Sequence, residues 1–172
     1  MDNITIARAG IKEAELLTNL SVTTFRDAFT AGNRQEDMDK YIADEMNLDK
    51  LTGELGDKEN IFFMAWHNAL PIGYAKLRAT KVPEELASNN AIELERLYVL
   101  QTYQSKKYGD RIMNHCLTYA IGQNYDTMWL GVWEHNHGAN RFYRRYGFEL
   151  FGDHVFMLGS DAQRDVLMKK AL

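Results

Sequence analysis

A short polar segment carries two neighbouring lysines between a strand-like run and a helix-like run. It reads Gln104-Ser105-Lys106-Lys107-Tyr108-Gly109 and is followed by Asp110 and Arg111. The first amides of a helix lack intrahelical partners and carry partial positive charge, and successive loop amides form an anion-binding concavity. With two lysines beside it, such a turn is predicted to bind phosphate or pyrophosphate. A solvated basic turn before a helix is the alternative that local chemistry leaves open.

A second group of candidate functional residues follows another strand-like run. Asn136 stands in the loop, and Ala139, Phe142, Tyr143 and Tyr146 recur at the spacing of one helix face. Asn136 can hydrogen-bond from the loop between strand and helix. Tyr143 places a phenol one helical turn from Ala139. A helix of core aromatic residues is the structural alternative for this segment.

Two glutamates in the first strand-like run are candidates for proton transfer. Glu93 and Glu95 are predicted to lie on one face because strand side chains alternate with a period of two. Either carboxylate can order a water as general base, and a solvated strand edge is the alternative. His135 and His137 flank Asn136, but two histidines alone do not complete a zinc site. We therefore expect no metal.

Hydrophobic periodicity predicts the elements that must position these groups. Strands are expected at residues 3–7, 60–67, 71–79, 94–100, 127–134, 154–159 and 165–172. Helices are expected at residues 11–29, 33–55, 112–121 and 139–146, the second opening with Asn33 and Glu36 as a capping-box variant. The lysine-bearing turn and the Asn136 loop each therefore connect a strand to a helix.

Bulk composition limits the class of protein. The chain has 172 residues, 45% apolar and 26% charged, so residues 1–172 are expected to form one globular domain. No apolar run approaches the ~20 residues that a membrane span needs, and the first residues lack the features of a signal peptide, so we expect no membrane partner. One cysteine fits a cytoplasmic location. The net charge of −4 argues against a nucleic-acid partner and suits a small cationic substrate.

Both loop-and-helix segments resemble signatures of the GCN5-related N-acetyltransferases (GNAT). The first resembles their Q/R-x-x-G-x-G/A pyrophosphate loop, in which Gln104 and Gly109 match and Lys107 replaces the first glycine. The side chain at Lys107 restricts backbone angles that glycine allows, and it adds a positive charge. The second resembles V-x-x-x-N-x-x-A-x-x-F-Y-x-x-x-G-F, and the matching residues are Asn136, Ala139, Phe142, Tyr143, Gly147 and Phe148. The whole chain looks most like the bacterial spermidine/spermine N-acetyltransferases of the PaiA type.

The resemblance implies an α/β (α+β) fold and a cofactor site. The implied sheet is mixed, with six to seven strands, a central parallel pair that splays apart, and about four flanking helices. Acetyl-CoA is the implied co-substrate, without a metal. The implied contacts are the backbone of Leu97, Tyr98 and Val99, the turn residues Gln104, Ser105, Lys106, Lys107, Tyr108, Gly109, Asp110 and Arg111, and, near the thioester, Asn136, Ala139, Phe142 and Tyr143.

The implied reaction is direct transfer of the acetyl group to a primary amine, with spermidine or spermine as the expected acceptor. Tyr143 would donate to the departing thiolate, the N–H of Val99 would polarise the thioester carbonyl, and Glu93 or Glu95 would assist deprotonation. Two alternatives remain open. One is acetylation of a peptide or protein N-terminus or lysine, and the other is a non-catalytic acetyl-CoA-binding regulatory module. A homodimer is compatible with the sequence.

Overall fold

The computed structural model describes residues 4–80 and 82–172, which form a seven-stranded sheet and five α-helices. The strands are β1 Ile4–Arg8, β2 Asn60–His67, β3 Leu70–Arg78, β4 Ala91–Val99, β5 Thr127–Trp133, β6 Glu149–Leu158 and β7 Asp161–Ala171. The helices are α1 Ala14–Phe29, α2 Gln35–Glu45, α3 Leu48–Gly56, α4 Tyr108–Gly122 and α5 His137–Arg145. The sheet order is β1-β2-β3-β4-β5-β7-β6, and only β4 and β5 pair in parallel among the described strands. The predicted mixed sheet with a central parallel pair is confirmed, with five helices in place of about four.

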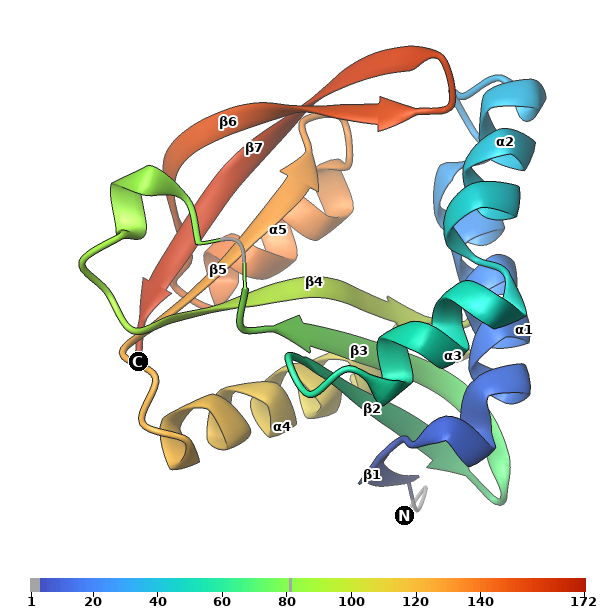
Figure 1. Ribbon diagram of the computed structural model, residues 1–172, viewed down its shortest axis with the longest axis horizontal. Coiled ribbons are helices and arrows are strands. Elements are labelled where there is room, and N and C mark those ends of the chain that lie inside the picture. Colours follow the sequence, from blue (N-terminus) through green and yellow to red (C-terminus); the bar gives the residue numbers. More distant parts are fainter. Residues whose placement is uncertain (1–3, 81) are drawn as a thin grey trace.

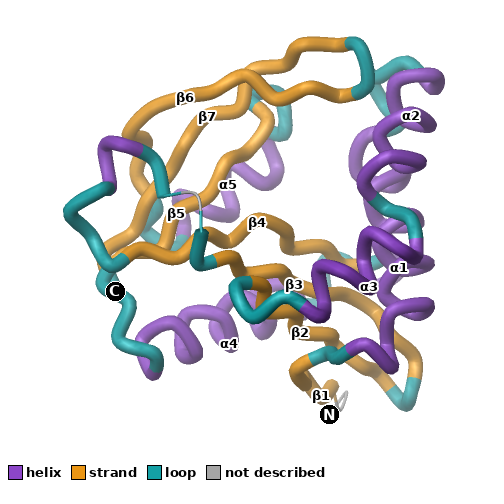
Figure 2. The backbone as a smooth tube through the Cα atoms, viewed as in Figure 1, coloured by secondary structure: helices purple, strands orange, loops and turns teal. Residues whose placement is uncertain are grey.

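Helices cover both faces of the sheet (Figures 1 and 2). Strand β2 shows why, because alternate side chains of its continuous apolar run face opposite layers. Ile61 and Phe63 belong to the core beneath α4, whereas Phe62 and Met64 pack in the cluster formed with α1 and α3. Helix α5 packs on the α4 side through its aromatic residues. The two loops that carry the candidate site residues follow β4 and β5. Because these strands are parallel, both loops open at the same end of the sheet.

The central parallel strands separate soon after they begin to pair. Their register covers three residue pairs and ends at Glu93 opposite Trp129. Strand β4 also carries a bulge, because its pairing with β3 moves from Lys76–Arg96 to Leu77–Leu94 and leaves Glu95 as the extra residue. A bulge bends a strand and increases its twist. The carboxyl-terminal half of β4 thus diverges from β5, which confirms the predicted splay.

The predicted helix over residues 33–55 is two helices. Asn47 interrupts it by capping α3, where its side-chain oxygen accepts a hydrogen bond from the amide of Lys50 at 2.9 Å. The capping role predicted for Asn33 is wrong, since its side-chain nitrogen donates to the carbonyl of Phe29 at 2.7 Å and so closes the end of α1. Arg34 precedes the first residue of α2 instead.

The last two strands are longer than predicted. They begin at Glu149 and Asp161, not at residues 154 and 165, and a tight turn at Gly159 and Ser160 joins them. Figure 1 shows this hairpin arching away from β5 toward helix α2. Residue 3, predicted as the start of the first strand, lies outside the described residues. No helix in the described ranges is long and apolar enough to cross a membrane.

Candidate active site

The larger of two adjoining cavities lies beside the diverging end of β4. It has a volume of about 1100 Å³ and is bounded by β4, the turn before α4, and helix α5. The amide of Leu100 donates to the carbonyl of Ile72 on β3 at 2.9 Å. Because backbone groups alternate along a strand, the N–H and C=O groups of Leu97 and Val99 point the other way, into this groove. The carbonyl of Val99 accepts a hydrogen bond there from the side chain of Gln104 at 3.1 Å.

The turn before α4 keeps a glycine-like shape although a lysine occupies the glycine position. Lys107 has φ 61° and Ser105 has φ 63°, both in the left-handed region. That conformation costs a non-glycine residue roughly 1–2 kcal/mol. The amide of Arg111 donates to the carbonyl of Lys107 at 3.2 Å, which begins the helix. The amides of Gly109 and Asp110 consequently have no acceptor within the helix and form part of its positive end.

Most of the residues predicted to bind the cofactor line this groove. Those that do are Leu97, Tyr98, Val99, Gln104, Ser105, Lys107, Tyr108, Gly109, Asp110, Asn136, Ala139, Phe142 and Tyr143. Two predicted residues do not line it. The ammonium group of Lys106 lies over the ring of Tyr103 at 5.4 Å, and Arg111 donates to the carbonyl of Ile4 at 3.3 Å.

Two arginines on α5 were missed by the sequence analysis, although both line the groove. Arg141 and Arg145 lie on the exposed side of the helix. Arg145 pairs with the carboxylate of Asp110 at 2.7 Å, which links the first turn of α4 to α5. Residues four apart lie on one helix face, so the spacing of Arg141 and Arg145 was a sequence signal that could have identified both.

A second cavity of about 220 Å³ meets the groove between the splayed strands. The residues common to both walls are Leu97, Tyr98, Asn136, Ala139 and Tyr143. The rest of the second cavity is rich in aromatic side chains, namely Phe25, Phe29, Tyr41, Trp133 and Phe156. A molecule in the groove and a molecule in this cavity would therefore meet beside Tyr143.

Helix α5 fixes the residues at this junction. The side-chain oxygen of Asn136 caps the helix by accepting from the amide of Ala139 at 3.2 Å. The ring of Tyr143 packs against Phe142 and Phe148, with centroid separations of 5.5 and 5.9 Å. Burial, reinforced by the nearby Cys116, raises the pKa of Tyr143 above its ordinary value. The phenol therefore stays protonated near neutral pH and is a hydrogen-bond donor.

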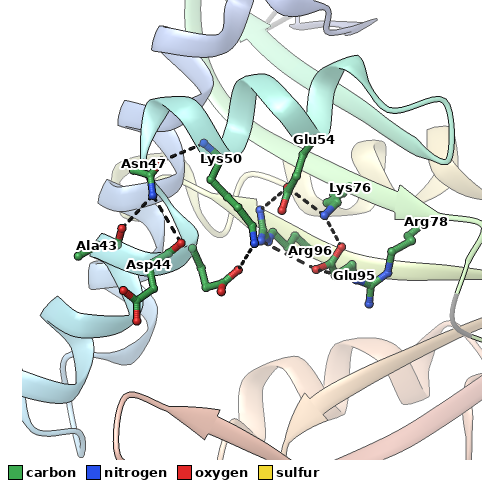
Figure 3. A network of polar contacts seen from close by, with 10 residues as sticks. Ala43, Asp44, Asn47, Lys50, Glu54, Lys76, Arg78, Glu95 and Arg96 are labelled. Carbon is green, nitrogen blue, oxygen red and sulfur yellow. Dashed lines mark hydrogen bonds and ion pairs between the residues drawn. The ribbon is translucent and has the colours of Figure 1, made fainter.

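A network of alternating charges supplies several residues of the second cavity's wall, and Figure 3 labels all of its members except Glu93. Its cations are Lys76, Arg78 and Arg96, and its anions are Glu54, Glu93 and Glu95. Lys76 is 2% exposed and pairs with Glu54 at 2.9 Å and with Glu95 at 2.6 Å. The β4 bulge brings Glu95 and Arg96 to the same face as Lys76. Glu93 and Glu95 share this face, as simple alternation predicted, and both contact Arg78, whereas the bulge adds Arg96 to it.

Cations contact both glutamates, but the pKa values of the two carboxyl groups shift in opposite directions. Arg78 contacts Glu93 at 2.6 Å, and burial raises the pKa of Glu93 while Arg78 offsets part of that rise. Burial also opposes ionisation of Glu95, but Arg96, Lys76 and Arg78 outweigh it and lower the pKa of that carboxyl. The base role predicted for these residues stays a prediction.

Other polar residues near the second cavity come from the last strands. His154 on β6 and Asp165 on β7 line it, and the sequence analysis missed both. His135, by contrast, is a mostly exposed side chain against the ring of Trp133. Within residues 4–80 and 82–172, no cluster of three or more histidine, cysteine, aspartate or glutamate side chains is arranged to hold a metal ion.

Comparisons with known proteins agree with this geometry. Residues 18–148 match the model of the acetyltransferase (GNAT) family. An uncharacterized N-acetyltransferase from the pepI 3' region of Lactobacillus delbrueckii subsp. lactis is 34% identical over 172 residues, covering 100% of this chain and 99% of that protein. An uncharacterized N-acetyltransferase of Mycobacterium tuberculosis is 26% identical over 160 residues, covering 93% and 98%.

Solved structures share the whole fold. The PaiA N-acetyltransferase of Thermoplasma acidophilum, determined in complex with coenzyme A, superposes with a TM-score of 0.83 at 21% identity and 99% coverage of both chains. A GCN5-related N-acetyltransferase from Rhodopseudomonas palustris gives a TM-score of 0.78 at 14% identity, covering 100% of this chain and 98% of that one. The architecture is therefore common to these structures despite low sequence identity.

Proposed function

The chain belongs to the acetyltransferase (GNAT) family and uses acetyl-CoA to acetylate an amine, and we propose that the amine is a polyamine bound in the aromatic cavity beside Tyr143. The observation that carries the proposal is the meeting of two cavities at Tyr143, one with an anion-binding turn and the other lined by aromatic rings and carboxylates. Aromatic faces and carboxylates both attract alkylammonium groups.

An adjoining hollow extends the acceptor cavity in the direction that a polyamine would need. This hollow has a volume of about 390 Å³ and shares Tyr41, Glu95, Arg96 and Phe156 with the cavity. Its outer wall adds Lys40, Asp44 and Glu45 from helix α2, and Lys40 pairs with Asp44 at 2.8 Å. We propose that a chain with several ammonium groups lies along this path, with its reactive nitrogen at Tyr143 and a distal nitrogen near α2. The resemblance of the sequence to spermidine/spermine acetyltransferases supports this choice of acceptor.

The closure of the cavity favours a small amine over a polypeptide. Asp37 on α2 accepts hydrogen bonds from the amide and hydroxyl of Ser160 at 2.8 and 2.7 Å. Gln163 on β7 donates to Asn33 at 2.6 Å. These contacts tie the β6–β7 hairpin to α2 and to the loop before it, over the aromatic cavity. An extended peptide backbone would need this side of the cavity to be open.

On the cofactor side, we propose that the pyrophosphate of acetyl-CoA binds the amides of Gly109 and Asp110, assisted by Lys107. Backbone groups of Leu97 and Val99 would pair with the amides of the pantetheine, in the manner of an added strand. The side chain of Gln104 donates a hydrogen bond to the carbonyl of Val99, so it would move away when the pantetheine pairs with that carbonyl. This arrangement would place the thioester at the junction of the two cavities, next to Tyr143.

The chemistry at that junction has two requirements. An alkylammonium with a pKa near 10 is only about one part in a thousand neutral at pH 7, so its deprotonation costs on the order of 4 kcal/mol. The sulfur must also be stabilised as it leaves. We propose that Tyr143 meets the second requirement by donating a hydrogen bond to the sulfur, and that the N–H of Val99 polarises the thioester carbonyl.

The proposal is tested by measuring thiol release from acetyl-CoA with a panel of acceptors. The panel contains spermidine, spermine, putrescine, an aminoglycoside, a lysine peptide and an N-terminal peptide. We expect saturable turnover with the polyamines and a kcat/KM for them at least ten times that for the peptides. Preferential turnover of a peptide would replace the acceptor assignment. Binding of acetyl-CoA without turnover of any amine would support a regulatory module instead.

A further inference from the structure

His154 lies on the acceptor cavity in a setting that suits proton transfer. It is the register partner of Asp165 on β7, and its Nε2 atom lies 3.7 Å from the Oδ2 atom of Asp165. Its ring crosses toward β5, where the position of a Cβ on Gly131 would be 3.4 Å from Nε2. Because residue 131 has no side chain, the imidazole can lie against the β5 backbone and face the cavity. The side chain of His154 is 45% exposed, so a proton can leave it to solvent.

The other ionisable groups in the cavity wall are poorly suited to accept a proton. The guanidinium groups of Arg78 and Arg96 have no acceptor atom. The cavity tyrosines remain protonated, since burial raises the pKa of Tyr41 to about 12 and also raises the pKa of Tyr98 and Tyr143. Glu93 and Glu95 are held by cations at 2.6 Å. Of the described residues in this wall, His154 alone is an imidazole with a carboxylate within 3.7 Å, and an imidazole exchanges its proton near neutral pH.

We propose that His154, oriented by Asp165, is the base that deprotonates the acceptor ammonium. The proton passes from the ammonium to the imidazole, directly or through one water, and frees the lone pair on nitrogen. That nitrogen attacks the thioester carbonyl carbon and forms the C–N bond. The C–S bond then breaks, and the sulfur leaves as a thiolate hydrogen-bonded by Tyr143. The second N–H proton of the new amide leaves to water or to the thiolate, and His154 releases its proton to solvent.

The charges around the ring set the pH at which His154 works. Asp165 on β7 raises the pKa of His154, burial opposes that rise, and Glu93 on β4 and Asp153 on β6 add to it. Asp153 is itself paired with Arg164 at 2.6 Å, which reduces its influence. Activity should therefore fall as the pH drops through the pKa of His154, because the protonated ring cannot accept a proton. Removing the carboxylate of Asp165 should move that fall to lower pH.

The proposal predicts that His154 matters only when the acceptor must lose a proton. We would compare His154→Gln with the wild type at pH 7, using propylamine, which is charged at that pH, and trifluoroethylamine, which is largely neutral. Thiol release from acetyl-CoA gives kcat/KM for each. We expect a loss on the order of 100-fold with propylamine and less than about threefold with trifluoroethylamine. A loss of equal size with both amines would mean a structural role and overturn the proposal, as would no loss with either.

Two further variants complete the test. Asp165→Asn should retain activity with the neutral amine and shift the acidic limb of the kcat/KM profile for propylamine to lower pH, and an unmoved limb would contradict the orienting role. His115→Gln is the matched control, because this half-buried histidine of α4 packs against Phe63 of β2, away from the cavity. The proposal rests on acetyl transfer and not on the polyamine assignment. If the enzyme acetylates simple amines but not spermidine, only the polyamine assignment is rejected. The kcat/KM losses of His154→Gln with propylamine and with trifluoroethylamine would still decide the role of His154.

Discussion

Replacing Tyr143 by phenylalanine removes one hydroxyl from the junction of the two cavities and leaves the ring. The phenol has a pKa above the ordinary value near 10, whereas a thiol has a pKa near 8.5, so complete proton transfer to the sulfur would be uphill by at least about 2 kcal/mol. Tyr143 therefore acts as a hydrogen-bond donor to the developing thiolate. A hydrogen bond to a charged group contributes roughly 1.5–3 kcal/mol.

We expect Tyr143→Phe to lower kcat by about 10- to 150-fold, which is the rate equivalent of that energy. The dissociation constant of acetyl-CoA should change little, because the ring keeps its packing against Phe142 and Phe148. The wild-type enzyme should also show no loss of activity from tyrosine ionisation up to about pH 10, since the pKa of Tyr143 is raised. Steady-state thiol release and calorimetric titration with acetyl-CoA measure these quantities.

The matched control is Tyr119→Phe, which removes a hydroxyl from a ring that packs against Phe63 outside both cavities. Its kcat should equal that of the wild type. If Tyr143→Phe had the same kcat as this control, the hydrogen-bond role would be refuted. If it instead lost acetyl-CoA binding, Tyr143 would be a cofactor contact and not a donor to the sulfur.

Three further substitutions test the turn, the charge network and the closure. Lys107→Gly should raise the melting temperature by relieving a left-handed lysine at φ 61°, and should weaken acetyl-CoA binding several-fold by removing a positive charge. Lys76→Met should lower the free energy of unfolding by up to about 3–5 kcal/mol in urea titrations, because it removes the nearest cation from Glu54 and Glu95, which keep only longer contacts to arginines. Gly159→Ala should raise KM for the amine without changing KM for acetyl-CoA, since its Cβ would lie 2.6 Å from the Cα of Asp37 and displace the hairpin.

Each of these substitutions has a control in the chain. Lys107→Ala removes the same charge but keeps a side chain at the strained position, so it should weaken acetyl-CoA binding without a gain in melting temperature. Lys40→Met breaks an exposed ion pair with Asp44 and should leave the free energy of unfolding unchanged. Gly53→Ala lies in helix α3 with no atom within 4 Å of its Cβ and should not alter KM for the amine. Equal melting temperatures in the two Lys107 variants would contradict the strain explanation. For the other two substitutions, an equal effect in the variant and its control would contradict the corresponding explanation.

The parts of the site that local sequence encodes could be predicted. The turn at Gln104–Gly109 and the helix carrying Tyr143 each depend on a few neighbouring residues with clear turn or helix signals. The hairpin of β2 and β3 also followed from two apolar runs and a short polar turn. The lysine in place of glycine still adopts a left-handed backbone conformation, with φ 61°.

The parts that depend on contacts between distant residues could not be predicted in this way. The bulge at Glu95 adds one residue to β4 and has no periodic signature, so the grouping of Glu95 with Arg96 and Lys76 was invisible. His154 and Asp165 begin two strands that the sequence predicts, but only the register between β6 and β7 brings them together. Asn47 was the exception, since its capping preference was readable and was overlooked.

The central claim is that acetyl-CoA and a polyamine occupy the two cavities at once and meet at Tyr143. The most direct test is the affinity of a conjugate in which the sulfur of coenzyme A is joined through an acetyl spacer to spermidine, compared with a conjugate carrying an uncharged chain of equal length. Isothermal titration would give both dissociation constants. We expect the spermidine conjugate to bind at least about tenfold more tightly, because linking two ligands raises their effective concentration and the acceptor cavity favours cations. Equal affinities, no greater than that of coenzyme A alone, would contradict the account.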